Sequence, residues 1–223
     1  GDVINFIQIL GNVLDLGVPS DATVSTAKIV DANVTLAKLS ATGTKNSTTF
    51  LRGDNTFNAP PLGGITEADQ WTLTTSFAND GDNYVTSNWE RNDNTAFAKL
   101  GTGLSESSGV FSFAATGLYY ITWMVWGSQN GSSRYNYARI EGTTDNSSYD
   151  AIAYNAFGIL PISSSAGHQS TVTSCYFNVT NVSTHKIKFK INSENEISIN
   201  AFGSGGAQSN SPAATFIRLG DAQ

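Results

Sequence analysis

The side chains best suited to catalysis or metal binding are scattered along this 223-residue chain and match no recognised motif. The two histidines, His168 and His185, have no acid or nucleophile at a familiar catalytic spacing. The segment Asp80-Gly81-Asp82-Asn83 has the composition of a calcium-binding loop, but it lacks the EF-hand spacing and the closing Glu. We expect a turn there, with a weak metal site as the alternative. The sequence therefore predicts no metal and no cofactor.

Three acidic residues, Glu141, Asp145 and Asp150, are close together in a segment that we expect to be a loop. We interpret them as solvated charge. Glycoside cleavage requires two carboxyl groups facing one groove, about 5–9.5 Å apart, and the sequence selects no such pair. We therefore predict that the chain is not an enzyme, with a glycan-cleaving protein as the alternative.

Two further groups could have either a functional or a purely structural role. The tripeptide Arg52-Gly53-Asp54 matches an integrin-type adhesion motif. We favour a tight turn with Gly53 at its bend and an Arg–Asp pair, either local or between subunits. Cys175 is the single cysteine and cannot form an internal disulfide, so a buried strand thiol is expected. A reactive thiol or an intersubunit bridge is the alternative.

The composition excludes two classes of partner. The net charge of −6 argues against nucleic acid, whose phosphates require clustered Lys and Arg. No apolar run approaches the roughly 20 residues of a membrane-spanning helix, so no membrane insertion is expected. Charged residues make up only 13% of the chain, about half the usual share, and Gly numbers 21. This profile is typical of an all-β protein with many turns, or of one with large intersubunit surfaces.

A decapeptide repeat, with nine matching positions D-A-x-V-[ST]-x-A-K-[IL] and a period of ten, occurs twice, at residues 21–29 and 31–39. Its apolar residues Val24, Ile29, Val34 and Leu39 recur every five positions, which fits neither an α-helix nor a strand cleanly. Helical and extended interpretations both stay open. Two short repeats cannot bury an apolar face by themselves, so we expect identical chains to associate around a symmetry axis.

Three regions follow one another along the chain. Residues 1–20 are interpreted as an N-terminal arm, and residues 21–64 as a repeat shaft with a Gly/Pro-rich connector of irregular structure. Residues 65–223 alternate short apolar segments with turn residues, which predicts an all-β sandwich or jelly-roll head without helices. The chain begins with Gly rather than Met, and we expect a fragment or a processed form. The strands are expected at residues 70–77, 84–90, 110–114, 117–127, 134–141, 151–157, 170–179, 185–191, 196–202 and 214–219.

Two of these expected strands have unusual patterns. Lys186, Lys188 and Lys190 alternate with apolar residues, so one strand face is basic and the other apolar. We interpret the lysines as a solvated face or as protection of a sheet edge. The strand containing Trp123 and Trp126 is apolar on both faces, which predicts a central buried strand or a trimer interface. A carbohydrate-stacking platform is the alternative.

The connector resembles a junction found in tailed-phage fibre proteins. The residues that carry the resemblance are Thr-Phe-Leu-Arg-Gly-Asp-Asn-Thr-Phe at 49–57, followed by Pro60 and Pro61. The decapeptide upstream is also similar to repeats of such fibres, so the resemblance covers residues 21–61. It implies a virion protein whose N-terminal segment docks on a tail, baseplate or capsid protein.

The head resembles the C1q/tumour-necrosis-factor-like jelly roll. The resemblance rests on the Gly-x-Phe strand and the Gly-x-Tyr turn and strand within residues 109–121, and on the apolar last strand at 215–219. Members of this family form compact trimers and bind partners through exposed loops or intersubunit grooves. The resemblance therefore implies a homotrimer that binds. Some relatives bind calcium, but no matching acidic cluster can be placed in this sequence.

We therefore predict a homotrimeric virion fibre or spike on the phage particle exterior. Its head is expected to bind a host surface component, either a glycan or a protein. A capsid or tail decoration protein and a cellular C1q-like adhesin or lectin are the alternatives. The candidate contact loops are residues 128–134, 142–150, 163–169 and 203–211. The candidate receptor-binding residues are Asn130, Arg134, Asp145, Asp150 and His168.

Overall fold

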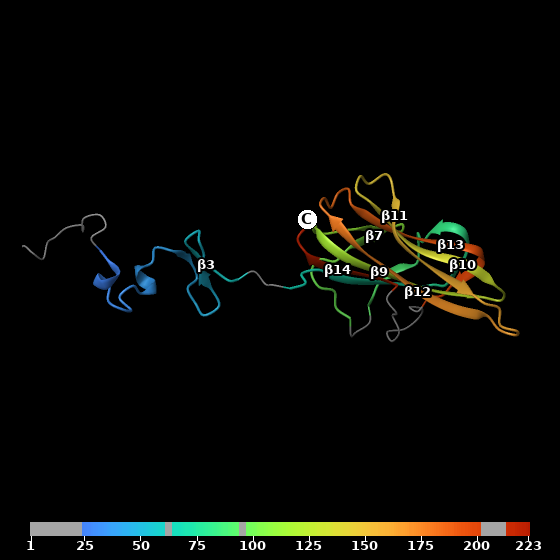
Figure 1. Cartoon of the computed structure of the whole chain (residues 1–223), viewed down its shortest axis with the longest axis horizontal. Helices are drawn as coiled ribbons and strands as arrows, with labels where there is room; N and C mark the ends of the chain where they lie inside the picture. The colour runs from blue at the N-terminus through green and yellow to red at the C-terminus, as the bar shows by residue number, and fades with distance from the viewer. Residues whose placement is uncertain (1–23, 61–63, 94–96, 202–212) are drawn as a thin grey trace, which may run out of the picture. The chain divides into compact units, whose positions relative to one another are not determined.

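The computed structural model describes residues 24–60, 64–93, 97–201 and 213–223. Contacts divide the chain into two units, Gly1–Gly63 and Gly64–Gln223 (Figure 1). In the described ranges the secondary structure consists of strands and two single-turn 3₁₀ helices, with no α-helix. The all-β prediction is therefore confirmed. The predicted arm, residues 1–20, and the candidate contact loop at 203–211 lie outside the described residues.

The described parts of the two copies of the decapeptide have the same local structure. Each contains one 3₁₀ turn, η2 (Thr26–Lys28) and η3 (Leu36–Lys38), at equivalent positions ten residues apart. The turns close through Lys28 N–H donating to Ser25 and Lys38 N–H donating to Thr35, both at 2.9 Å. The repeat is therefore neither a continuous helix nor a strand, as its five-residue period indicates. Its apolar side chains, including Val24, are largely exposed in the single chain.

The connector has more regular structure than the sequence predicts. Three short strands, β1 (Thr42–Gly43), β2 (Phe50–Leu51) and β3 (Thr56–Asn58), form a small sheet in the order β1-β3-β2. Gly43 has a φ of +90°, and a Cβ there would lie 2.2 Å from the carbonyl oxygen of Phe57. Only glycine permits this close approach. The expectation of irregular structure was wrong because turn-forming residues here separate strands only two or three residues long.

Two layers of antiparallel strands build the second unit (Figure 1). The first layer, here called the β9 sheet, has the order β6-β4-β14-β9-β12. The second, the β13 sheet, has the order β11-β10-β13, with β5 and β8 along the other edge of β13 and β7 beyond β8. The layers join where Ser198 and Ile199 of β13 pair with β9. The strands are β4 (Ala68–Leu73), β5 (Phe77–Tyr84), β6 (Trp89–Arg91), β7 (Ser105–Ser107), β8 (Val110–Ser112), β9 (Gly117–Gln129), β10 (Ser133–Thr143), β11 (Asp150–Ile159), β12 (Gly167–Val179), β13 (Lys186–Ile199) and β14 (Ala214–Gly220).

Three expected features differ in the structure. The strand expected at 84–90 does not form, because β5 ends at Tyr84, residues 85–88 are not in a strand and β6 begins at Trp89. The segment Asp80-Gly81-Asp82-Asn83 lies inside strand β5 and pairs with β13, so the prediction of a turn was wrong. Gly81 has a φ of +73°, which keeps a turn-like conformation within the strand where its register with β13 shifts. The two strands expected at 185–191 and 196–202 are one long strand, β13, whose course includes this irregularity.

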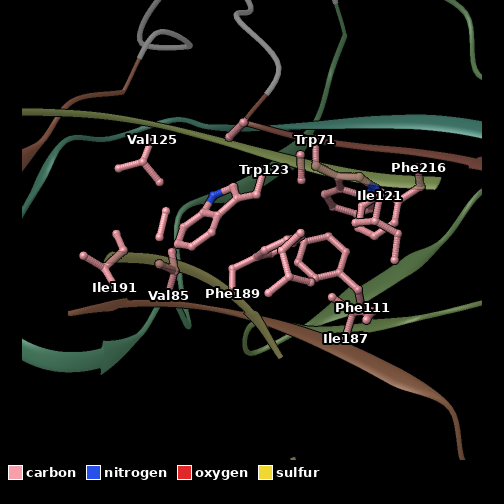
Figure 2. Close-up of a cluster of buried hydrophobic side chains, with 14 of the residues drawn as sticks. Trp71, Val85, Phe111, Ile121, Trp123, Val125, Ile187, Phe189, Ile191 and Phe216 are labelled. Carbon is pink, nitrogen blue, oxygen red and sulfur yellow. The ribbon is translucent and has the colours of Figure 1, made fainter. Parts of the chain in front are cut away.

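Aromatic side chains fill the space between the two sheets (Figure 2). Trp123 of β9, Phe111 of β8, Phe189 of β13 and Phe216 of β14 are fully buried. Neighbouring ring centroids in this group lie 5.1–5.3 Å apart for Trp123–Phe189, Phe111–Phe189 and Phe111–Phe216. Edge-on and tilted aromatic pairs at this separation contribute about 0.5–1.5 kcal/mol beyond the burial of their surface. Odd-numbered residues of β9 and β13 face this core, so their even-numbered neighbours form the outer faces of the two sheets.

Candidate functional site

The five candidate receptor-binding residues are divided between the two ends of the sandwich. From β9 to β12, each strand runs in the direction opposite to the one before it. The β9–β10 and β11–β12 connections therefore lie at one end of the sandwich, and the β10–β11 connection lies at the other end. Asn130, Arg134 and His168 belong to the end where β9 and β11 finish. Asp145 and Asp150 belong to the other end. One loop-based site therefore cannot contain all five.

Asn130 is exposed in the turn between β9 and β10 and borders an open hollow of about 670 Å³ with residues 161–165. Arg134 is engaged by Glu194: its backbone N–H and its Nε each donate to that carboxylate at 2.7 Å. The hydrogen bond from Arg134 holds the pKa of Glu194 below its ordinary value. His168 lies at the start of β12 rather than in a loop, with its ring 5.4 Å from that of Trp126.

Asp145 uses its carboxylate to close its own turn. Thr143 Oγ1, Ser147 N–H and Ser148 N–H all donate to Oδ1, at 2.7–2.8 Å. The hydrogen bond from Thr143, followed by those from the two backbone groups, lowers the pKa of Asp145. Asp150 is exposed at the first residue of β11.

The expected grouping of Glu141 with these two aspartates does not form. Glu141 is buried near the end of β10 and accepts a short hydrogen bond from the hydroxyl of Tyr84.

The other potentially reactive groups, in the Arg-Gly-Asp turn and at Cys175, have local contacts or burial that account for them. Asp54 of the Arg-Gly-Asp turn accepts hydrogen bonds from the N–H and hydroxyl of Thr56, and its carboxylate lies 3.9 Å from Arg52. These contacts match the predicted tight turn with a local ion pair. Burial raises the pKa of the Cys175 thiol to about 11, so it is protonated at neutral pH and a poor nucleophile. Within the described ranges, no three His, Cys, Asp or Glu side chains are grouped to hold a metal ion. None of the described helices has the length and apolar character needed to cross a membrane.

Apolar side chains lie exposed on the outer face of the β9 sheet. Val172 and Tyr176 of β12 are 53% and 68% exposed. In register with them on β9 are Met124 and Tyr120, and the rings of Tyr120 and Tyr176 are 5.5 Å apart. Ile217 of β14 pairs with Tyr120 on its other side. The sequence indicated this exposed face because the β9 segment is apolar on both sides. It did not indicate that β12 also contributes to the face.

The outer face of the β13 sheet carries a mixed aromatic and charged group that the sequence interpretation missed. Lys188 and Lys190 lie among tyrosine rings and carboxylates, so they are neither fully solvated nor at a sheet edge. β13 is paired on both sides, which makes protection of an edge the wrong interpretation of these lysines. The alternation of lysine in β13 was the available signal, but the partners come from β5, β10 and the connection after β10.

No protein-family model matches the chain, and no curated protein matches its sequence. Among solved structures, Eiger TNF from S. frugiperda has a TM-score of 0.51 at 10% identity, over 70% of this chain and 94% of that one. Murine APRIL at pH 5.0 has a TM-score of 0.47 at 11% identity, over 69% of this chain and 98% of that one. The PRD1 vertex protein P5 has a TM-score of 0.39 at 21% identity, over 70% and 99%. The similarity to Eiger TNF shows that the strands of this chain have the TNF-like jelly-roll fold.

Proposed function

We propose that this chain is a homotrimeric virion fibre or spike whose head binds a glycan on the host surface. It acts by binding, without catalysis. The N-terminal segment docks on a tail, baseplate or capsid protein, and the head projects from the particle. Three equivalent sites on one head, and many heads on one particle, raise the effective concentration of weak individual sites.

The observation that carries the proposal is the exposed apolar face of the β9 sheet. A soluble protein rarely leaves such a face in water, because each Val or Leu side chain that is fully buried contributes about 1.5–3 kcal/mol. Association of identical chains around a threefold axis covers Tyr120, Val172 and Tyr176 in every copy. The exposed apolar residues of the repeat, such as Val24 and Val34, favour the same arrangement for the shaft.

Virion attachment is supported by the sequence of the connector and by the polar loops of the head. The Thr-Phe-Leu-Arg-Gly-Asp junction resembles those of phage fibres, and the loops are rich in Ser, Asn and Gly, which hydrogen-bond readily to sugar hydroxyls. A purely structural decoration protein has the same trimer but no affinity for the host. Binding of the purified protein to host cells distinguishes the two.

The first experiment is the mass of the purified full chain by light scattering, with the variant Tyr176→Glu. We expect about three times the 23.6 kDa chain mass for the native protein. A charge at position 176 has to be desolvated in the interface, so the variant should dissociate. Tyr135→Glu is the matched control, since Tyr135 is also an exposed strand tyrosine but lies in the β13 sheet.

A monomeric native chain would contradict the proposed trimer. A trimer that persists in Tyr176→Glu would show that the exposed face of the β9 sheet is not the interface.

A further inference from the structure

One row of residues crosses the outer face of the β13 sheet. Backbone pairing places Tyr84 of β5 opposite Lys190 of β13, Lys190 opposite Arg139 of β10, and Arg139 opposite Tyr154 of β11. Because directly paired residues point to the same side of a sheet, the four side chains share one face. Two cations therefore lie between two tyrosines, on the side of the sheet that faces away from the core.

The carboxylates on this face are already matched by cations. Asp82 lies 2.8 Å from Lys190 Nζ and 3.4 Å from Arg139 Nη1. Glu141 lies 3.8 Å from the same lysine and also accepts the Tyr84 hydroxyl. Burial alone raises the pKa of Asp82, but the hydrogen bond and charge of Lys190 outweigh it, and the net pKa is lowered.

A third cation on this face packs against aromatic rings. Lys188 has its Nζ 3.9 Å from the centre of the Tyr149 ring and 5.0 Å from that of Tyr84. Among the described residues, it has no carboxylate within ion-pair distance. Arg139, Lys188 and Lys190 therefore bring three cations together on one face of a chain whose net charge is −6. This local concentration of cations favours an anionic ligand.

An open hollow lies at the Tyr154 end of the row. Its volume is about 380 Å³, and it is lined by Tyr137, Arg139, Ala151 and Tyr154. This volume falls in the roughly 300–1,000 Å³ range of small-molecule sites. The rings of Tyr137 and Tyr154 are 6.0 Å apart and nearly perpendicular, at 73°. Tyr154 is 64% exposed, so its ring offers a flat apolar surface to a ligand.

Arg139 supplies the polar group of the hollow. Its guanidinium carbon lies 5.7 Å from the centre of the Tyr137 ring, and its hydrogen bond to Asp82 is long, at 3.4 Å. A guanidinium carries five N–H donors in a planar fork that matches the two oxygens of a carboxylate. The lining therefore combines two aromatic rings, a small methyl group and one carboxylate-binding cation.

We propose that this hollow binds a carboxylated sugar unit of a surface polysaccharide. The sugar ring packs on Tyr154 and Tyr137, and its carboxylate pairs with Arg139. This assignment rests on the proposed attachment function and names the class of glycan that is bound. These three cations are too few for a nucleic acid, which requires more phosphate contacts, or for an anionic membrane surface, which takes about four to eight cations.

The test is calorimetric titration of the full chain with short oligosaccharides that contain glucuronate, galacturonate or sialate. The carboxyl-reduced form of each oligosaccharide is the matched neutral ligand. We expect at least one acidic oligosaccharide to bind, and its reduced form to bind at least tenfold more weakly. The variants Arg139→Met and Tyr154→Ala should each weaken binding tenfold or more. Tyr154 is exposed, so its variant leaves folding intact even if Arg139→Met does not.

Arg52→Met is the control variant, because Arg52 is an exposed arginine of the connector, and it should bind as the native chain does. Arg134→Met tests the candidate loop site, because Arg134 is an exposed arginine on the same strand as Arg139. Loss of binding in Arg134→Met, with native affinity in Arg139→Met and Tyr154→Ala, would overturn this inference and keep the attachment function at the loops. Equal affinity for the reduced sugars, or binding to host cells without binding to any acidic oligosaccharide, would also overturn it. A chain that binds neither cells nor sugars would contradict both proposals.

Discussion

Removal of the Asp69 carboxylate should be among the most damaging single changes in the head. Asp69 is 1% exposed on β4 and accepts hydrogen bonds from three different segments. Trp71 Nε1 and Leu104 N–H donate to Oδ2 at 3.1 and 2.9 Å. Arg91 Nη2 donates to Oδ2 at 3.0 Å, and its Nε donates to Oδ1 at the same distance. One side chain thereby ties β4 to β6 and to the segment that precedes β7.

The magnitude follows from these contacts. In Asp69→Ala the Trp71 and Leu104 donors lose their acceptor in a buried site, at about 1–3 kcal/mol each. The ion pair with Arg91 adds less than a fully buried pair would, because the arginine side chain is 33% exposed and water can replace the carboxylate. We expect a total loss of about 2–6 kcal/mol, most of it from the two buried donors that lose their acceptor. This is a large part of the roughly 5–15 kcal/mol that stabilises a typical domain.

The assay is denaturant-induced unfolding at neutral pH, with all proteins at one concentration because an oligomer's stability depends on it. Asp69→Asn tests the reasoning further. It preserves the shape of the side chain, but its amide N–H₂ then meets groups that are themselves donors, so the loss should be similar to that of Asp69→Ala. Glu90→Ala is the control, since this exposed residue of β6 should change stability by no more than about 0.5 kcal/mol. A loss below about 1 kcal/mol in Asp69→Ala would refute the assignment of Asp69 as a buried anchor.

Three further predictions concern the backbone, the thiol and one phenol. Gly109 and Gly81 both have positive φ, but only at Gly109 would a Cβ meet main-chain atoms closer than 3 Å. Gly109→Ala should therefore cost about 2–4 kcal/mol in unfolding free energy and Gly81→Ala about 1 kcal/mol; equal losses would contradict the steric explanation. The Cys175 thiol, whose pKa burial raises to about 11, should react with iodoacetamide far more slowly in the native chain than in denaturant. Reaction at the rate of a free thiol would show that Cys175 is not buried. Burial, together with the hydrogen bond and charge of Glu141, raises the pKa of Tyr84 to about 12. Since this exceeds the ordinary value of 10, the contribution of Tyr84 to stability is complete below pH 10 and is lost as the pH rises through about 12. The stability of Tyr84→Phe should fall less steeply over that interval, and a parallel fall in both proteins would contradict the shift.

The predictions that succeeded rest on local patterns. The strands at 117–127 and 214–219 were predicted nearly at their observed bounds because each is a short apolar segment rich in aromatic and β-branched residues. The apolar character of both faces of the first segment predicted a central strand, and its Trp123 is fully buried in the core. The likeness of the head to a jelly roll was carried by a few glycines and aromatic residues, whose spacing marks turns and core strands.

The predictions that failed depend on partners distant in the sequence. The local composition of 80–83 favours a turn, but pairing with β13 makes the segment a strand. The lysines of β13 have a solvated pattern, yet Tyr84, Asp82 and Glu141 arrive from other strands to surround two of them. The three-stranded sheet of the connector likewise forms between segments too short to have a pattern of their own.

The sequence by itself determined the all-β class of the head, the basic and apolar faces of the segment at 186–190 and the ten-residue period of the N-terminal repeat. These properties follow from the alternation and spacing of residues that are neighbours along the chain. Only the tertiary structure decided which candidate binding residues lie together on one surface. It placed Asn130 and Asp145 at opposite ends of the sandwich, and it brought Tyr84, Arg139 and Tyr154 into one row. The physical reason is that strand order and register are chosen by the packing of the whole core, so they are not encoded within any one strand.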